Sequence, residues 1–162
     1  MTAVAIEPWS IRATFAASGR APLIRRSALV LAPRRGGLLR GTLVHVPPTV
    51  LIVDDHAGFR SLARALLDAE GFAVVGEAED GATAIAAVEA LRPAVVLLDI
   101  QLPDLDGFEV AERISLLSDA PAVVLVSTRS AGAYGPRLET AAARGFIPKT
   151  SLSGAALAAL VS

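Results

Sequence analysis

The stretch VLLDIQLPD, residues 96–104, decides the fold of this chain, because a continuous apolar run ends abruptly at Asp99. Apolar residues without polar alternation are typical of a strand that is buried on both faces, as in a parallel sheet. Asp99 is then either a turn former that ends the strand or a reactive carboxylate presented at its tip. For the next acid, Asp104, we predict an ordinary loop position without chemistry.

Similar apolar runs recur on both sides of this stretch and alternate with segments of helical periodicity. The predicted strands are residues 49–53, 72–76, 94–98, 122–126 and 145–148. The apolar residues at helical spacing are Phe59, Leu62, Ala63 and Leu66, then Ile85, Val88 and Leu91, then Val110, Ile114 and Leu117, and finally Leu152, Ala156, Ala159 and Leu160. A short fourth helix is predicted to begin near Pro136. This alternation indicates a small doubly wound α/β fold with helices on both faces of a parallel sheet.

The composition excludes several classes of protein. Hydrophobic residues make up 53% and charged residues 19% of the chain, which is enough for a buried core. The absence of cysteine excludes disulfides, thiolate chemistry and cysteine-ligated metal. No apolar run approaches the ~18 residues of a membrane span, so we expect a soluble, cytoplasmic protein without a membrane partner.

The charge of the chain is divided between two segments of different composition. Residues 1–46 contain seven arginines and one acid, a net charge of +6, whereas residues 47–162 carry a net charge of −7. We place the boundary before Pro47 and expect residues 1–46 to be an Arg-rich extension without ordered structure. A second interpretation is upstream sequence translated from a misplaced start, with the true start near Val44 or Val46. Residues 47–162 would form the folded domain.

Polar groups follow directly after most of the predicted strands. The first strand is followed by Asp54 and Asp55, the third by Asp99, the fourth by Ser127 and the fifth by Lys149. Taken singly, each of these residues has an ordinary explanation as a helix cap, a turn former or a solvated surface residue. The carboxyl ends of parallel strands share one edge of the sheet, however, so these groups are expected to converge there.

Three converging carboxylates repel one another unless cations hold them, and Mg²⁺ with oxygen ligands, assisted by a lysine, is the natural solution. Such a site suits phosphoryl transfer, with a carboxylate as nucleophile and a hydroxyl donor for one phosphoryl oxygen. His56 is either a further metal ligand or a surface residue. Ser127 lacks a histidine partner at a strand end, because His45 and His56 are the only histidines, and no glycine-rich phosphate loop is present.

Four motifs in this order resemble the receiver domain of two-component response regulators, from about Thr49 to Val161. They are VLIVDDHAGFR, VVLLDIQLPDLDGFEV, VVLVST and GFIPK. The resemblance implies a flavodoxin-like (βα)5 fold, a five-stranded parallel sheet of strand order 2-1-3-4-5. Thr150 follows the lysine where the family commonly has proline, which makes the chain similar to receivers of LuxR-type regulators.

The resemblance also implies a role for each strand-tip residue. Asp99 is expected to be the phosphoacceptor, and Lys149 and Ser127 to engage the phosphoryl group. Mg²⁺ is expected to bind Asp99, the acid pair Asp54 and Asp55, and the backbone carbonyl of Gln101. Phe146 occupies the aromatic switch position, which is expected to move when Ser127 is drawn to the phosphoryl group.

The implied function is a response regulator receiver that takes a phosphoryl group from a histidine kinase or a phosphotransfer protein. No enzymatic activity is expected beyond its own phosphotransfer and dephosphorylation. Because the sequence stops after the fifth helix, we expect a stand-alone receiver that signals through an unidentified protein and does not bind DNA directly. The alternatives are an aspartyl-phosphate hydrolase of the haloacid dehalogenase type, with its nucleophile on the first strand, and a docking module that works without phosphate.

Overall fold

A five-stranded parallel sheet forms the centre of the molecule, in a computed structural model that describes residues 27–30 and 42–162. Its strands are β3 (Thr49–Val53), β4 (Ala73–Ala78), β5 (Val95–Asp99), β6 (Ala122–Ser127) and β7 (Gly145–Pro148). They lie in the order β4-β3-β5-β6-β7, and every neighbouring pair is parallel. The predicted order 2-1-3-4-5 and the flavodoxin-like fold are therefore confirmed.

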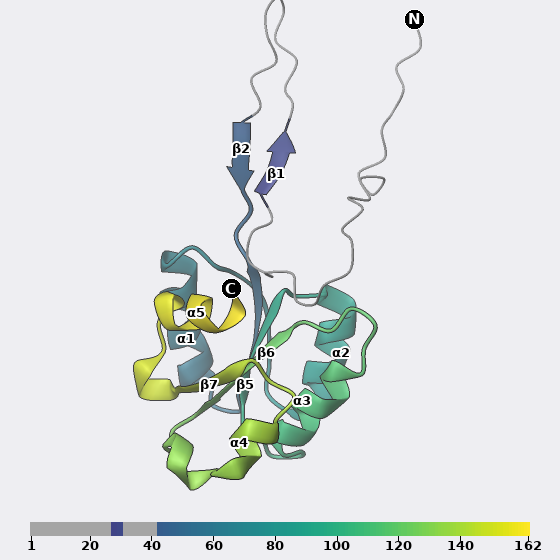
Figure 1. The fold of residues 1–162 in the computed structure, drawn as a ribbon, viewed down its shortest axis with the longest axis vertical. Coiled ribbons are helices and arrows are strands. Elements are labelled where there is room, and N and C mark those ends of the chain that lie inside the picture. Colours follow the sequence, from purple (N-terminus) through teal and green to yellow (C-terminus); the bar gives the residue numbers. More distant parts are fainter. Residues whose placement is uncertain (1–26, 31–41) are drawn as a thin grey trace, which may run out of the picture.

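Helices cover both faces of this sheet (Figure 1). They are α1 (Ala57–Ala69), α2 (Gly81–Leu91), α3 (Gly107–Ser115), α4 (Pro136–Thr140) and α5 (Gly154–Val161), with short 3-10 turns at Ala131–Ala133 and Lys149–Ser151. Helices α1 and α5 pack on one face, and α2, α3 and α4 on the other. The fourth helix does begin at Pro136 and is the shortest of the five, as its Gly- and Pro-rich sequence predicted.

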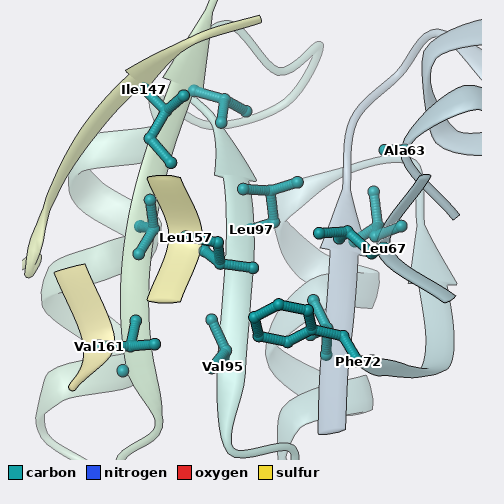
Figure 2. Close-up of a cluster of buried hydrophobic side chains, with 13 residues drawn as sticks. Ala63, Leu67, Phe72, Val95, Leu97, Ile147, Leu157 and Val161 are labelled. Atoms are coloured by element: carbon teal, nitrogen blue, oxygen red, sulfur yellow. The ribbon is translucent and has the colours of Figure 1, made fainter. Parts of the chain in front are cut away.

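The hydrophobic core consists of two clusters, one on each face of the sheet. Strands β5 and β6 are buried along their whole length because helices cover them on both sides. Figure 2 shows the cluster beneath α1 and α5, where Leu67 and Leu157 extend from the helices towards Val95 and Leu97 of β5. This packing fixes the strands, and through them the positions of the residues at the strand tips.

Three of the predicted helix faces need correction, and in α2 the residue concerned is Leu91, which is 45% exposed. Leu62 in α1 is 65% exposed, whereas Leu67, which the helical spacing missed, is fully buried. In α5, Ala159 is exposed and the buried residues include Leu157 and Val161. The physical reason is that α5 is apolar on all sides, so the sequence offers no contrast from which to read its buried face.

The limits of three predicted strands also shift by one or two residues. The strand predicted at 72–76 starts one residue later and continues to Ala78, because it lies at the sheet edge and tolerates the polar Glu77. Asp99 and Ser127 are the last residues of their strands.

Before the central sheet, the strands β1 (Ser27–Val30) and β2 (Thr42–His45) pair antiparallel. They lie within the segment for which we expected no ordered structure. Most of that segment lies outside the described residues, so the expected domain boundary stays a prediction. In the described part of the chain, no helix has the length and apolar character that crossing a bilayer requires.

Candidate functional site

Two acids are buried side by side at the carboxyl edge of the sheet. Asp99 is the last residue of β5 and is 3% exposed, and Asp54 directly follows β3 and is fully buried. The parallel register pairs Val53 of β3 with Leu98 of β5, so the residues that follow are neighbours across the two strands. The arrangement follows from the sequence, because each apolar run ends in an aspartate at the same height of the sheet.

Lys149 brings these two acids together. It follows β7 directly, and its Nζ lies 3.0 Å from Asp99 Oδ2 and 2.5 Å from Asp54 Oδ2. The lysine side chain is 9% exposed, and its ammonium lies 4.6 Å from the centre of the Phe59 ring of α1. One desolvated cation is thus shared by two buried carboxylates, and an aromatic face supports it.

For both Asp99 and Lys149, burial shifts the pKa in one direction and the opposite charge nearby shifts it in the other. Burial raises the pKa of Asp99, Lys149 counters part of that effect, and the nearby charge of Asp54 adds to it. Burial alone would lower the pKa of Lys149, but its close contacts and charge interactions with Asp54 and Asp99 outweigh it, so that the pKa rises. Lys149 therefore stays cationic at neutral pH, while Asp99 accepts a proton more readily than an ordinary aspartate.

Asp54, Asp55 and His56 offer a further cluster beside this pair. One ligand atom from each residue lies within 4.8 Å of the others. The His56 ring contacts Asp55 Oδ1 at 2.6 Å, and Asp54 Oδ1 accepts the backbone N–H of His56 at 2.9 Å. The other Asp54 oxygen, Oδ2, is buried without a hydrogen bond of acceptable geometry among the described residues, despite its close contact with Lys149. A buried carboxylate oxygen with spare acceptor capacity fits a hard divalent cation.

Gln101 lies two residues beyond Asp99 at the start of the following loop. Its backbone N–H interacts with the Asp99 carboxylate and opposes the effect of burial on the pKa of that acid. An isolated antiparallel bridge to Asp106 also holds Gln101 in place. The role of the Gln101 carbonyl as a metal ligand stays a prediction.

Ser127, the last residue of β6, is fully buried and its hydroxyl has two hydrogen-bond partners. Its Oγ lies 2.6 Å from the hydroxyl of Tyr134 and accepts the backbone N–H of Arg129 at 3.1 Å. Tyr134 packs between Phe108 of α3 and Phe146 of β7, with ring centroids 5.9 and 6.0 Å apart. The predicted switch residue Phe146 is therefore in contact with the ring that holds Ser127.

The loop between β5 and α3 packs closely against the phosphoacceptor candidate. A side chain at Gly107 would place its Cβ 2.3 Å from the Asp99 carbonyl oxygen and 2.7 Å from Ile100 Cα, so only glycine fits. Arg137 of α4 packs against the start of α3. Its guanidinium pairs with Asp106 at 2.6 Å and lies 4.2 Å from the centre of the Phe108 ring.

Sequence reasoning missed three residues that take part in the site or support it. Phe59 was read only as a core residue, and Tyr134 had no prediction because it lies in an irregular Gly-rich segment. Asp104, predicted as a plain loop residue, accepts the backbone N–H groups of Gly81 and Ala82 at 2.8 and 3.0 Å and so caps α2. The sequence gives no local signal for these contacts, because those of Phe59 and Asp104 join distant segments and that of Tyr134 depends on the path of an irregular segment.

The sheet order, the buried acid pair and the lysine from the last strand together define a receiver-type α/β protein. Residues 50–161 match the response regulator receiver domain, and the chain belongs to this family. The family excludes the haloacid dehalogenase alternative, in which the nucleophile would lie on the first strand.

Curated relatives and solved structures agree with this assignment. A putative transcriptional regulator of Pseudomonas aeruginosa is 39% identical over 100 residues, which are 62% of this chain and 48% of that protein. The virulence regulator BvgA of Bordetella pertussis is 35% identical over the same shares of each chain. This chain thus spans about half the length of these relatives.

Among solved structures, the receiver domain of the putative response regulator NarL from Mycobacterium tuberculosis is 34% identical, with a TM-score of 0.62 over 70% of this chain and 96% of that one. CheY of Borrelia burgdorferi, solved in complex with CheX, beryllofluoride and magnesium, is 27% identical. Its TM-score is 0.61 over 72% of this chain and 88% of that chain.

Proposed function

We propose that this chain accepts a phosphoryl group on Asp99 and signals through contact with a protein partner. The observation that supports this best is the Asp99 carboxylate at the tip of β5, with Lys149 Nζ 3.0 Å away and Asp54 Oδ2 2.5 Å from the same ammonium. A buried nucleophile with a fixed cation beside it is what phosphoryl transfer requires of a protein.

The transfer itself needs little from the chain beyond position and charge. An Asp99 oxygen attacks the phosphorus of a phosphohistidine, and the new P–O bond forms as the P–N bond breaks. The imidazole leaves with the electron pair and takes a proton from water. Lys149 favours the ionised form of Asp99 before the transfer, and afterwards it neutralises part of the added charge of about −1.5 to −2.

The donor set also fits Mg²⁺, which supplies charge neutralisation to the phosphoryl oxygens when it is bound. Asp54, Asp55 and Asp99 are the residues that would hold it, with the Gln101 carbonyl as a fourth ligand. The buried Asp54 Oδ2, which has an ion pair with Lys149 but no well-aligned hydrogen bond among the described residues, supports this assignment. His56 contacts Asp55 and so orients one of the proposed ligands.

A histidine kinase or a phosphotransfer protein is the proposed donor, and a protein the proposed recipient of the signal. The relatives from Pseudomonas and Bordetella are described as transcription regulators, and their matched parts make up 48% of their length. We propose that this chain does not bind DNA directly, because residues 47–162 carry a net charge of −7, which phosphate backbones repel.

The test is phosphorylation by acetyl phosphate with Mg²⁺, followed by intact-protein mass spectrometry. We expect the wild-type chain to gain one phosphoryl group and Asp99→Asn to gain none. Asp104→Asn is the matched control, because it removes a loop acid five residues from Asp99 and should be phosphorylated like the wild type. Phosphorylation that persists in Asp99→Asn would place the acceptor elsewhere, and no phosphorylation of the wild type would contradict the proposal.

A further inference from the structure

The hydroxyl of Ser127 has two hydrogen-bond partners, and neither of them is a carboxylate. Both of its hydrogen-bond partners, Tyr134 and the backbone N–H of Arg129, belong to the segment that follows β6. Among the described residues, Ser127 Oγ makes no hydrogen bond to Asp99 or Lys149. A serine hydroxyl has one proton to donate, so a Ser127 that donates to the Tyr134 oxygen must give up that bond before it can donate to a phosphoryl oxygen.

We propose that Tyr134 is a positioning residue that latches Ser127 in its unphosphorylated position, an inference that rests on the proposed phosphorylation of Asp99. The Tyr134 hydroxyl lies 2.6 Å from Ser127 Oγ, the shorter of the two contacts that fix this hydroxyl. When a phosphoryl group on Asp99 recruits the Ser127 hydroxyl, the bond to Tyr134 breaks. Tyr134 therefore opposes the phosphorylated state by the strength of one hydrogen bond.

The surroundings of Tyr134 explain what keeps its ring in place and which elements change when its hydroxyl is released. The ring is half-buried between Phe108 of α3 and Phe146 of β7. Arg137 lies 4.2 Å from the centre of the Phe108 ring and pairs with Asp106 at the start of α3. Release of the tyrosine hydroxyl thus frees a ring that joins α3, the segment before α4 and β7.

The test measures the affinity of the full chain for beryllofluoride with Mg²⁺, as a stable substitute for the phosphoryl group. Tyr134→Phe removes the hydroxyl and keeps the ring between its two aromatic neighbours. A net hydrogen bond is worth roughly 0.5–1.5 kcal/mol, so we expect Tyr134→Phe to bind beryllofluoride about 2- to 10-fold more tightly than the wild type. Thr128→Ala, which truncates the exposed side chain next to Ser127, is the control and should bind like the wild type.

A double-mutant cycle separates the latch from a general effect on stability. In the Ser127→Ala background no hydroxyl remains to be latched, so Tyr134→Phe should leave the affinity unchanged. Tyr134 is the only tyrosine in the chain, so a selectively labelled protein gives one set of tyrosine ring signals by NMR. We expect beryllofluoride to move these signals in the wild type and to move them little in Ser127→Ala.

The outcomes distinguish this inference from the function on which it rests. Equal or weaker beryllofluoride binding by Tyr134→Phe, or an equal gain in the Ser127→Ala background, would overturn the latch and leave the phosphoacceptor role of Asp99 intact. A wild-type chain that binds no beryllofluoride would overturn both.

Discussion

Asp99 and Asp104 are the same residue type five positions apart, and the structure gives them opposite surroundings. Asp99 is buried, and burial raises its pKa despite the nearby Lys149. Asp104 is exposed, and the backbone N–H groups of Gly81 and Ala82 hold its pKa below the ordinary value. Asp99 is the proposed nucleophile, whereas Asp104 stabilises the N-terminus of α2 through hydrogen bonds and the helix dipole.

The cap gives a prediction with a defined pH dependence. Because the pKa of Asp104 is lowered in the folded state from 3.8, its contribution to stability is complete above about pH 4 and is lost as the pH falls through the lowered value. We expect Asp104→Ala to lower the thermal midpoint at pH 7, and the difference from the wild type to shrink below about pH 4. Thermal unfolding followed by circular dichroism from pH 7 to pH 2 measures this.

Asp104→Asn is the graded control for this prediction, because its amide oxygen still accepts one of the two N–H groups, and it should fall between the wild type and Asp104→Ala. A difference that is absent at pH 7, or that grows on acidification, would contradict the role of Asp104 as a cap.

At the scale of single elements, the sequence predicted well which segments form helices and strands. It predicted less well which face of each helix is buried. β5 and β6 were recognisable because Val and Leu continue without polar interruption, which only a doubly covered strand tolerates. The buried face of α5 could not be predicted, because apolar residues lie on all sides of this helix. In α1, Leu62 was predicted to be a core residue, yet it is exposed. Periodicity identifies a helix, but packing against a particular neighbour decides which of its apolar residues are buried.

The junction between β5 and α3 supplies the prediction at this scale. The Cβ in Gly107→Ala would meet backbone atoms of Asp99 and Ile100 rather than a flexible side chain, so α3 or the loop must shift. We expect a loss of about 1–3 kcal/mol in the free energy of unfolding and slower phosphorylation by acetyl phosphate. Urea unfolding and the rate of mass gain measure the two effects.

The matched control for Gly107→Ala is Gly58→Ala in α1. Nothing lies within 4 Å of a Cβ at Gly58, so alanine should be neutral or stabilise the helix by up to about 1 kcal/mol. If both variants behaved alike, the close approach of α3 to Asp99 would have no energetic consequence.

For the whole molecule, the sequence was sufficient for the sheet and for the convergence of Asp54, Asp99 and Lys149. Each follows an apolar run, and parallel strands place their tips at one edge. The contact of Tyr134 with Ser127 could not be read in the same way. It depends on the path of an irregular segment, which local propensity does not fix.

The two oppositely charged segments of the chain lead to a prediction about nucleic acid. Residues 47–162 carry a net charge of −7 and residues 1–46 a net charge of +6. We expect no sequence-specific DNA binding by the full chain, and any weak binding through the arginines should disappear as salt is raised. Electrophoretic mobility shifts with and without competitor DNA, at two salt concentrations, test this. A specific complex that survives competitor would show that the chain contacts DNA directly.

The phosphoacceptor role of Asp99 is tested most directly by mapping the modified residue. Borohydride reduces an aspartyl phosphate to homoserine, so treatment with acetyl phosphate and Mg²⁺ followed by reduction should convert one aspartate. Peptide mass spectrometry should then find homoserine at position 99, with Asp54, Asp55 and Asp104 unchanged. Homoserine at any of those three positions, with Asp99 intact, would contradict the proposed role.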